Sequence, residues 1–471
     1  MKKLDSITSL ESWIDSYLNF EKTPKKNIFW LDTMKFFCEK FGHPESFAPC
    51  FHVAGSKGKG SVSTFIASIL DEAGYKTGIY TSPHILDFIE RVSSAEGPFE
   101  EEAYDEAAKE LMDGVKSIKT SELPAERPIT WFELVTLFSF LVFRAAKVDY
   151  SVFEVGLGGR LDSTNVVSPV CSVITPIELE HTEFLGDTLE KIASEKGGII
   201  KENTPVVIAR QRPEVRKVFE KIAEEKHAKA VFVEDIIENL NFKIKSVIKC
   251  AENNTKRAQK CTSLQDDDVL SLMSVGFKSK IFVRPIKANL RMLGKFQTEN
   301  AALAALAVKT ALPDISEEVI EKGLSKAGLP ARFEILKNPK GFENIPYLVL
   351  DGAHTVNSVK FTMETMRQVF GETDACSLLF ACAADKDVSD IAPLFKNRFA
   401  EVFLTKPGNV KQADLKTLAK AFDDAEISYD LNEDFENQIK KALAKADAGK
   451  EILLITGSFY LIAEVKKLLE S

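Results

Sequence analysis

The stretch His52-Val-Ala-Gly-Ser-Lys-Gly-Lys-Gly-Ser61 decides the fold, because it joins a strand-like run to a helix-like one through closely spaced glycines. Backbone N–H groups in such a loop can converge on phosphate oxygens, and the helix that follows adds the partial positive charge of its N-terminus. Lys59 supplies a full positive charge, and the Ser61 hydroxyl can reach Mg²⁺. The predicted phosphate-binding residues are Gly55, Ser56, Lys57, Gly58, Lys59, Gly60 and Ser61. The spacing departs from the common GxxxxGK[ST] form, so a glycine-rich turn with two solvated lysines is the alternative.

Strand-like and helix-like runs alternate on the C-terminal side of this loop. Short runs rich in β-branched residues begin at Tyr150, Ser172 and Pro205. A long apolar helix is expected over 131–146, behind a capping box in which Glu133 is the acid. This alternation predicts a parallel sheet wrapped by helices.

The alternation breaks down over 225–290. Residues 251–268 are polar and unpatterned and are predicted to be a surface excursion, beside a small antiparallel appendage with strands at 242–248 and 280–283. Strand-like runs then return at Tyr347, Ser377, Val402 and Ile452. We therefore expect a first domain over 1–330 and a second over 331–471.

Composition excludes several classes of protein. The chain has 471 residues, 45% apolar and 28% charged, which suits two or three globular domains. A balance of 61 basic and 70 acidic residues gives a net charge of −9, which argues against a nucleic-acid partner. Seven cysteines without a CxxC pair favour reduced, buried thiols in a cytoplasm. The longest apolar run, 134–143, is too short to span roughly 30 Å of hydrocarbon, so no membrane role is expected.

Three further strand ends carry side chains suited to a hard cation. Glu154 ends a buried run before a glycine-rich loop, His181 follows the next run, and Ser82 follows the run 77–80. Because ligands bind at the carboxyl ends of parallel strands, these side chains and Ser61 are predicted to hold Mg²⁺. Ser82 is also an ordinary turn former, and His181 can instead be a helix-start residue bonded to backbone. Glu154 lies among apolar neighbours and needs a cation.

Histidine and lysine placement adds two observations. Of six histidines, four are expected in loops at strand ends, namely His52, His84, His181 and His354. Lys196 falls in the last turn of a helix that ends at two glycines, where the helix dipole alone favours a lysine. On the pattern alone, Lys196 is a structural residue.

Taken together, the motifs resemble the folylpolyglutamate synthase/dihydrofolate synthase family of the Mur ligase superfamily. FEVGLGGRLDSTNVV (153–167) is the most specific to that family, whereas the phosphate loop and LDGAH (350–354) are shared more widely among Mur-type ligases. The other matching motifs are TSPHI (81–85), the segment 181–201, FQTENAALA (296–304), PARFE (330–334), DKD (385–387) and ITGSFYL (455–461). The match therefore runs in order over nearly the whole chain.

The resemblance implies an α/β fold with an N-terminal P-loop-type, parallel-sheet ATPase domain and a smaller C-terminal Rossmann-like domain. It implies a monomeric ligase that uses ATP and two Mg²⁺ ions to join L-glutamate to folate or dihydropteroate through an acyl phosphate. It reverses the reading of Lys196, which matches a position where the family carbamylates a lysine. Gln297 and Asn300 match nucleotide-contacting positions. The resemblance implies that groups from the linker and second domain close over ATP, namely Arg332, Asp351 and His354. The implied catalytic residues are Lys59, Lys196, Arg332 and His354.

The sequence departs from the family at several positions. Lys57 replaces a small polar residue, Asp87 and Ile89 stand where Arg and Asn are frequent, and Thr355 stands where Asn is usual. The changes at Asp87 and Ile89 lie near the pterin-side substrate in the family and affect substrate detail. A Mur-type ligase acting on another carboxylate is the alternative within the class. An ATP-hydrolysing switch or transporter ATPase is the alternative outside it.

Overall fold

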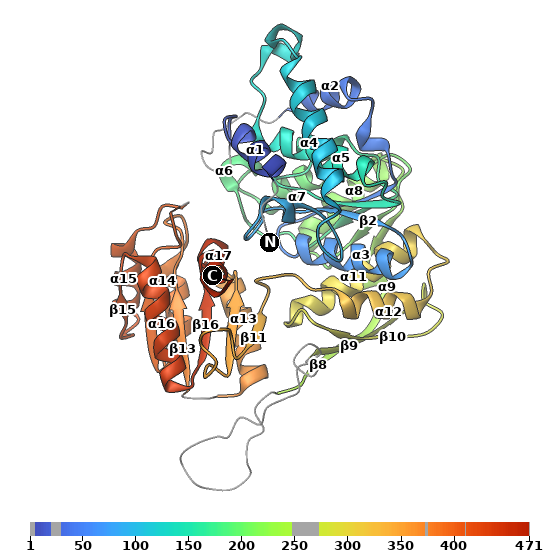
Figure 1. Cartoon of the computed structure of the whole chain (residues 1–471). Helices are drawn as coiled ribbons and strands as arrows, with labels where there is room; N and C mark the ends of the chain where they lie inside the picture. The colour runs from blue at the N-terminus through green and yellow to red at the C-terminus, as the bar shows by residue number, and fades with distance from the viewer. Residues whose placement is uncertain (1–4, 20–29, 247–272, 373–374, 410, 471) are drawn as a thin grey trace. The chain divides into compact units, whose positions relative to one another are not determined.

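The computed structural model describes residues 5–19, 30–246, 273–372, 375–409 and 411–470. The chain divides into two compact units, the first comprising Met1–Asn241, Gly276–Ala288 and Phe296–Ala327, and the second Phe242–Val275, Asn289–Lys295 and Gly328–Ser471 (Figure 1). The excursion predicted at 251–268 lies outside the described residues.

The first unit is built on a seven-stranded sheet with the order β3-β2-β4-β1-β5-β6-β7. Neighbouring strands are parallel except that β3 runs antiparallel to β2. The strands are β1 (Cys50–Ala54), β2 (Thr77–Tyr80), β3 (Val92–Ser94), β4 (Tyr150–Glu154), β5 (Cys171–Ile174), β6 (Val206–Ile208) and β7 (Ala230–Phe232). β1, β2 and β5 are buried at every residue, as expected for parallel strands covered on both faces.

Helices cover both faces of this sheet. In Figure 1, α4 (Glu101–Lys116) and α5 (Trp131–Ala145) lie on one side, and α3 (Lys59–Glu72), α11 (Lys295–Ala311) and α12 (Glu317–Lys326) lie on the other. The predicted capping box of α5 is confirmed, because Thr130 N donates to the Glu133 carboxylate at 2.8 Å and Glu133 N donates back to the Thr130 hydroxyl at 3.3 Å. Glu133 is thus the capping acid that the sequence indicated. The other helices of the first unit are α1 (Asp5–Ile14), α2 (Asp32–Lys40), α6 (Thr182–Leu185), α7 (Leu189–Gly197), α8 (Pro213–Glu225) and α9 (Val233–Ile236).

Strand register places four loops at one edge of the sheet. Val53 pairs with Glu154, Ala54 with Ile174, and Tyr80 with Phe153, so β1, β2, β4 and β5 end nearly level. Because these strands are parallel neighbours, the loops that follow them all leave from the same carboxyl edge.

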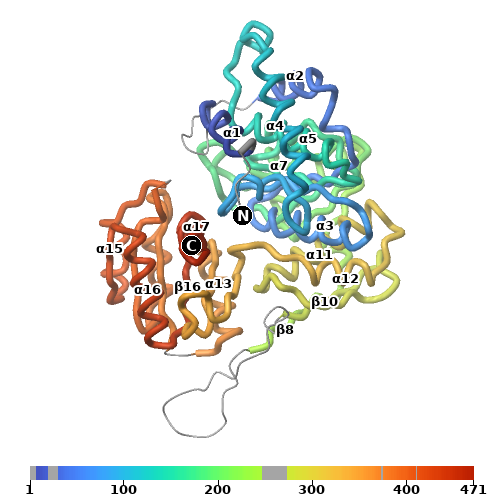
Figure 2. Tube along the Cα trace, viewed as in Figure 1, coloured from blue at the N-terminus to red at the C-terminus, as the bar shows by residue number. Residues whose placement is uncertain are grey.

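The second unit contains a six-stranded sheet with the order β11-β12-β16-β13-β14-β15. The strands are β11 (Glu334–Lys337), β12 (Tyr347–Asp351), β13 (Cys376–Phe380), β14 (Glu401–Leu404), β15 (Asp430–Leu431) and β16 (Ile452–Thr456), and only β11 is antiparallel to its neighbour. Figure 2 traces the accompanying helices α13 (Val356–Phe370), α15 (Leu415–Asp424), α16 (Phe435–Gly449) and α17 (Phe459–Glu470), and α14 covers Val388–Ile391. The predicted α/β fold, with a larger and a smaller parallel-dominated sheet, is confirmed.

A separate three-stranded sheet has the order β10-β9-β8, formed by β8 (Ile237–Ile244), β9 (Met273–Ser279) and β10 (Ile286–Leu290). The strand predicted at 280–283 is wrong, because this segment turns the chain between β9 and β10. Phe282 N donates to Ser279 O, and the Val283 side chain is 91% exposed. A short apolar run of this kind forms a strand only where it pairs with a neighbour, and this one lies in the turn between two strands.

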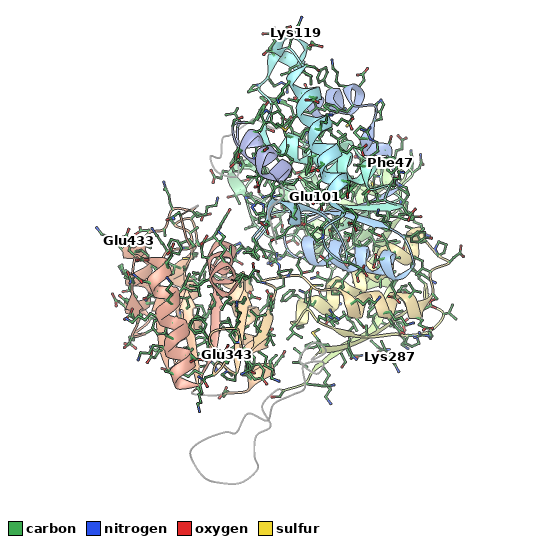
Figure 3. All side chains as sticks on the ribbon, in the orientation of Figure 1. Phe47, Glu101, Lys119, Lys287, Glu343 and Glu433 are labelled. Carbon is green, nitrogen blue, oxygen red and sulfur yellow. The ribbon has the colours of Figure 1, made fainter. Side chains whose placement is uncertain are left out.

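Surface and interior agree with the composition. Charged side chains such as Lys119, Glu343 and Glu433 point away from the ribbons (Figure 3). The cysteines that the structure describes, Cys38, Cys50, Cys171, Cys376 and Cys382, are buried and unpaired with one another. Within the described ranges, no helix combines the length and apolar character needed to cross a bilayer.

Candidate active site

The phosphate loop lies between β1 and α3, as predicted. Gly55 has φ +139°, and a Cβ at this position would lie 1.8 Å from Thr175 Oγ1, so only glycine fits. Gly58 precedes the first turn of α3 with φ +90°. The first N–H groups of a helix have no intrahelical acceptor. Lys59, Gly60 and Ser61 therefore present donors at the carboxyl edge of the sheet.

Three lysines surround one carboxylate beside this loop. Lys59 Nζ donates to Gly55 O at 3.1 Å, and Lys196 Nζ donates to the same carbonyl at 2.8 Å. Lys196 also pairs with the Glu180 carboxylate at 2.9 Å, and Lys57 Nζ lies 3.8 Å from its second oxygen. Positive charge thus exceeds negative charge here, which suits a polyanionic ligand.

Burial and charge shift the pKa of both partners in the Lys196–Glu180 pair. Burial, reinforced by Lys59, lowers the pKa of Lys196 to about 8, although Glu180 opposes the shift. Burial alone would raise the pKa of Glu180, but Lys59 and Lys196 outweigh it and lower this pKa to about 2. Glu180 is therefore ionised, and the Lys196 ammonium loses its proton more readily than an exposed lysine does. Sequence reasoning missed Glu180, although it directly precedes His181.

The predicted nucleotide-contacting residues of α11 reach the phosphate loop. Gln297 Nε2 donates to Ser61 Oγ at 3.2 Å, and Asn300 Nδ2 donates to Gln297 Oε1 at 2.9 Å. All three side chains are buried. A Cβ at Gly58 would lie 2.6 Å from Asn300 Oδ1, so the loop and α11 fit closely. Ser61, Gln297 and Asn300 form one hydrogen-bonded row.

Two of the predicted metal ligands lie together at the ends of neighbouring strands. Ser82 N donates to Glu154 Oε2 at 3.3 Å, and the Glu154 side chain is 5% exposed at the end of β4. Ser61 lies in the first turn of α3, which follows β1, the other neighbour of β4. Carboxylate and hydroxyl oxygens are the donors that Mg²⁺ prefers, so the residue types at these strand ends fit the predicted ion.

His181 lies in the loop after β5. It has φ +47° and starts α6 through its carbonyl, which accepts hydrogen bonds from Phe184 N and Leu185 N. Its side chain does not cap the helix. Metal ligation by the His181 imidazole stays a prediction.

The expectation that His52 lies in a loop is wrong. His52 is fully buried within β1, and its Nε2 lies 2.8 Å from Thr164 Oγ1. Because the Thr164 hydroxyl donates to Asp162, His52 Nε2 is the donor of that contact. Burial and the nearby Lys201 lower the pKa of His52 to about 3, so it is a neutral core histidine. In the sequence HVA, His52 has a β-branched neighbour on its C-terminal side only. This local pattern does not distinguish a strand from a loop.

The predicted residues of the second unit gather at the end of β12. The Arg332 guanidinium lies 4.6 Å from the Phe459 ring centroid, and His354 Nδ1 donates to Gly352 O at 2.7 Å. The Asp351 carboxylate accepts N–H groups of Phe333 and Ala353, and burial raises its pKa. Arg332, Asp351 and His354 thus share one corner of this unit, while their contact with nucleotide stays a prediction.

Comparison with known proteins agrees with this geometry. Residues 53–308 match the Mur ligase middle domain, and residues 331–459 match the Mur ligase, glutamate ligase domain. A dihydrofolate synthase/folylpolyglutamate synthase of Bacillus subtilis is 33% identical over 465 residues, which cover 98% of each chain.

Solved structures are similar over the same length. Folylpolyglutamate synthase of Thermotoga maritima superposes with a TM-score of 0.77 at 26% identity, covering 99% of this chain and 97% of that one. Escherichia coli FolC in complex with DHPP and ADP gives a TM-score of 0.75 at 25% identity, covering 98% and 97%.

Proposed function

This chain belongs to the folylpolyglutamate synthase/dihydrofolate synthase family of Mur ligases, and from that premise we propose that it is an ATP-dependent ligase joining L-glutamate to folate. The observation that carries the proposal is the convergence of Lys57, Lys59 and Lys196 on Gly55 O and Glu180, beside the first turn of α3. Such a site holds a triphosphate by fixed charge and backbone donors.

The reaction takes two steps. An oxygen of the folate γ-carboxylate attacks the γ-phosphorus of ATP, and the bond from this phosphorus to the β-phosphate oxygen breaks. ADP is released, and the folate carries an acyl phosphate. The neutral amine of glutamate then attacks the acyl carbon and loses one proton, and the tetrahedral intermediate expels phosphate to leave the amide. Lys59 and the N–H groups that begin α3 stabilise the negative charge spread over the transferring phosphoryl group.

Ser61, Ser82, Glu154 and His181 would hold Mg²⁺ in this scheme. When bound, the ion would neutralise charge on the β- and γ-phosphates. Gln297 orients the Ser61 hydroxyl by donating a hydrogen bond to its oxygen, so the hydroxyl proton points away from Gln297. Ser82 N steadies the Glu154 carboxylate in the same way.

We also propose that Lys196 is carbamylated in the active enzyme. Its side chain is 2% exposed and its pKa is lowered to about 8, so a neutral amine is accessible near neutral pH. The Lys196 ammonium first loses one proton, and the neutral amine nitrogen then forms a bond to the carbon of CO₂ and releases a second proton. The two losses together replace a positive charge with a negative one. Lys57 and Lys59 lie near Lys196 and would offset both the new anion and the neighbouring Glu180 carboxylate.

Carbon-13 NMR tests this modification directly. Protein equilibrated with ¹³C-bicarbonate should show a carbamate resonance that is lost in Lys196→Ala. Lys201 is the matched control, because its pKa is also lowered to about 8. A resonance that persists in Lys196→Ala and disappears in Lys201→Ala would assign the carbamate to Lys201. The absence of the resonance from active wild-type protein would refute carbamylation of Lys196.

Turnover assays test the ligase function. Phosphate release from ATP should require both L-glutamate and tetrahydrofolate, with a product one glutamate longer by mass spectrometry. Dihydropteroate is the second acceptor to test, because relatives carry both activities in their names and the E. coli structure holds DHPP. Turnover with UDP-sugar acids but not with folates would point to another Mur-type ligase. Phosphate release that is independent of glutamate and acceptor would point to an ATPase.

A further inference from the structure

The loop at 156–165, which we call the Asp162 loop, is closed by one buried carboxylate. Asp162 is 5% exposed and accepts hydrogen bonds from Leu157 N at 2.9 Å and Thr164 N at 3.0 Å, as well as from the Thr164 hydroxyl. Several charge-assisted bonds to one carboxylate fix the loop in a single conformation. His52 in β1 anchors its far end through Thr164.

This rigid loop is seated on the last turn of α7. Arg160 N donates to Glu195 O at 2.7 Å. A Cβ on Gly159 would lie 2.8 Å from Glu195 O and 2.9 Å from Lys196 O, so the loop backbone touches the helix backbone there. The last carbonyls of a helix have no intrahelical donors. Arg160 N of the Asp162 loop supplies one such donor, to Glu195 O, which also accepts from Gly198 N, and so the loop is bonded to the last turn of α7.

Asn165 ties the two segments together. Its side-chain Nδ2 donates to Arg160 O in the loop at 3.0 Å and to Gly198 O after α7 at 3.1 Å. The side chain is 6% exposed, and within the described part of the chain its Oδ1 accepts no hydrogen bond. Both amide protons are therefore committed to the junction. The orientation of the amide is fixed, because reversing it would set Oδ1 against two carbonyl oxygens.

The end of α7 carries Lys196, whose Nζ reaches 2.8 Å from Gly55 O in the phosphate loop. We propose that Asn165 is a positioning residue that sets Lys196 against the phosphate loop. The catalytic consequence rests on the proposed ligase function, whereas the positioning itself does not. The Asn165 side chain acts through the backbone carbonyls of residues 160 and 198. Among the described residues, it has no hydrogen bond to a predicted metal-binding or nucleotide-binding residue.

Chemical labelling of Lys196 measures its placement without any assay of turnover. Full-length protein is treated with a limiting dose of acetic anhydride, and acetylation of each lysine is quantified by peptide mass spectrometry. Asn165→Asp places a carboxylate against two carbonyl oxygens, and Asn165→Ala removes both donors without adding charge. Because two buried hydrogen bonds are lost, Lys196 acetylation should rise about tenfold or more in both variants. Lys309 is the internal reference, since it is buried and bonded to Ile315 O.

Ser172→Ala is the matched control for stability. Ser172 is also fully buried and donates to Ile199 O at 2.8 Å, so its loss removes a hydrogen bond from the same segment without touching the Asp162 loop. Lys196 acetylation in Ser172→Ala should stay within about twofold of wild type, even where its melting temperature falls as much as that of the Asn165 variants. If Asn165→Asp fails to fold, Asn165→Ala carries the comparison.

Kinetics add a readout that general destabilisation does not move. The Asn165 variants should lose about tenfold in kcat while the KM for the folate changes little, because substrate contacts are intact. Equal acetylation of Lys196 in wild type and both Asn165 variants would overturn the proposal, as would an equal rise in Ser172→Ala. If wild type has no ligase activity but labelling behaves as described, the positioning stands and the proposed function fails.

Discussion

Substituting Gly58 by alanine tests the fit between the phosphate loop and α11. Gly58 has φ +90°, where a residue with a Cβ is strained by about 1–2 kcal/mol. The new Cβ would also lie 2.6 Å from Asn300 Oδ1. Asn300 must then move, which breaks its bond to Gln297 and costs about 1 kcal/mol. Together these effects come to about 2–3 kcal/mol. If the variant loop relaxes without nucleotide and must return to this geometry to bind it, that energy corresponds to roughly 30- to 150-fold in the affinity for ATP.

Isothermal titration with a non-hydrolysable ATP analogue measures this loss, with thermal unfolding followed in parallel. A double-mutant cycle separates the two causes. In an Asn300→Ala background the clash disappears, so Gly58→Ala should cost only the backbone strain, which leaves a coupling energy near 1 kcal/mol. Wild-type affinity in Gly58→Ala, or additive effects in the cycle, would refute the close fit described here.

Two further predictions concern single lysines. Lys59→Ala should keep the wild-type melting temperature but lose about 10²–10³ in kcat, because a fixed charge on the transferring phosphoryl group is removed. Trapping of the acyl phosphate with hydroxylamine measures this, and undiminished trapping would remove Lys59 from the site. Lys201→Met should flatten the pH dependence of the free energy of unfolding between pH 8 and 10.5, measured by urea titration. Burial lowers the pKa of Lys201 to about 8 from 10.5, so the unfolded chain holds the proton through this window and wild-type stability rises with pH. An unchanged slope would contradict the burial of this amine.

Local chemistry made much of the fold predictable from sequence. Runs of β-branched and aromatic residues located β1, β4 and β5, because buried parallel strands carry such side chains on both faces. The Thr130–Glu133 capping box located the start of α5. Short strands with mixed composition, such as β3 and β11, gave no comparable pattern. Both are antiparallel edge strands with partly exposed residues, and pairing with a neighbour rather than local sequence specifies them.

The site was less accessible to such reasoning. The glycine loop and the residues at strand ends could be found, since strand ends gather at one edge of a parallel sheet. The link between Ser61 and Gln297 joins positions 236 residues apart, and only the resemblance to a family suggested it. Glu180 and Asn165 went unnoticed because their roles depend on which backbone or ammonium groups tertiary packing brings within reach.

That long separation has a consequence for biosynthesis. A ribosome adding roughly 5–20 residues per second needs roughly 10–50 s to travel from the Ser61 codon to that of Gln297. Once Lys196 has been added, the nascent chain carries its glycine turn and all three lysines but still lacks the helix that completes the row. The emerging polypeptide should therefore acquire nucleotide affinity late and in one step, when α11 docks beside α3.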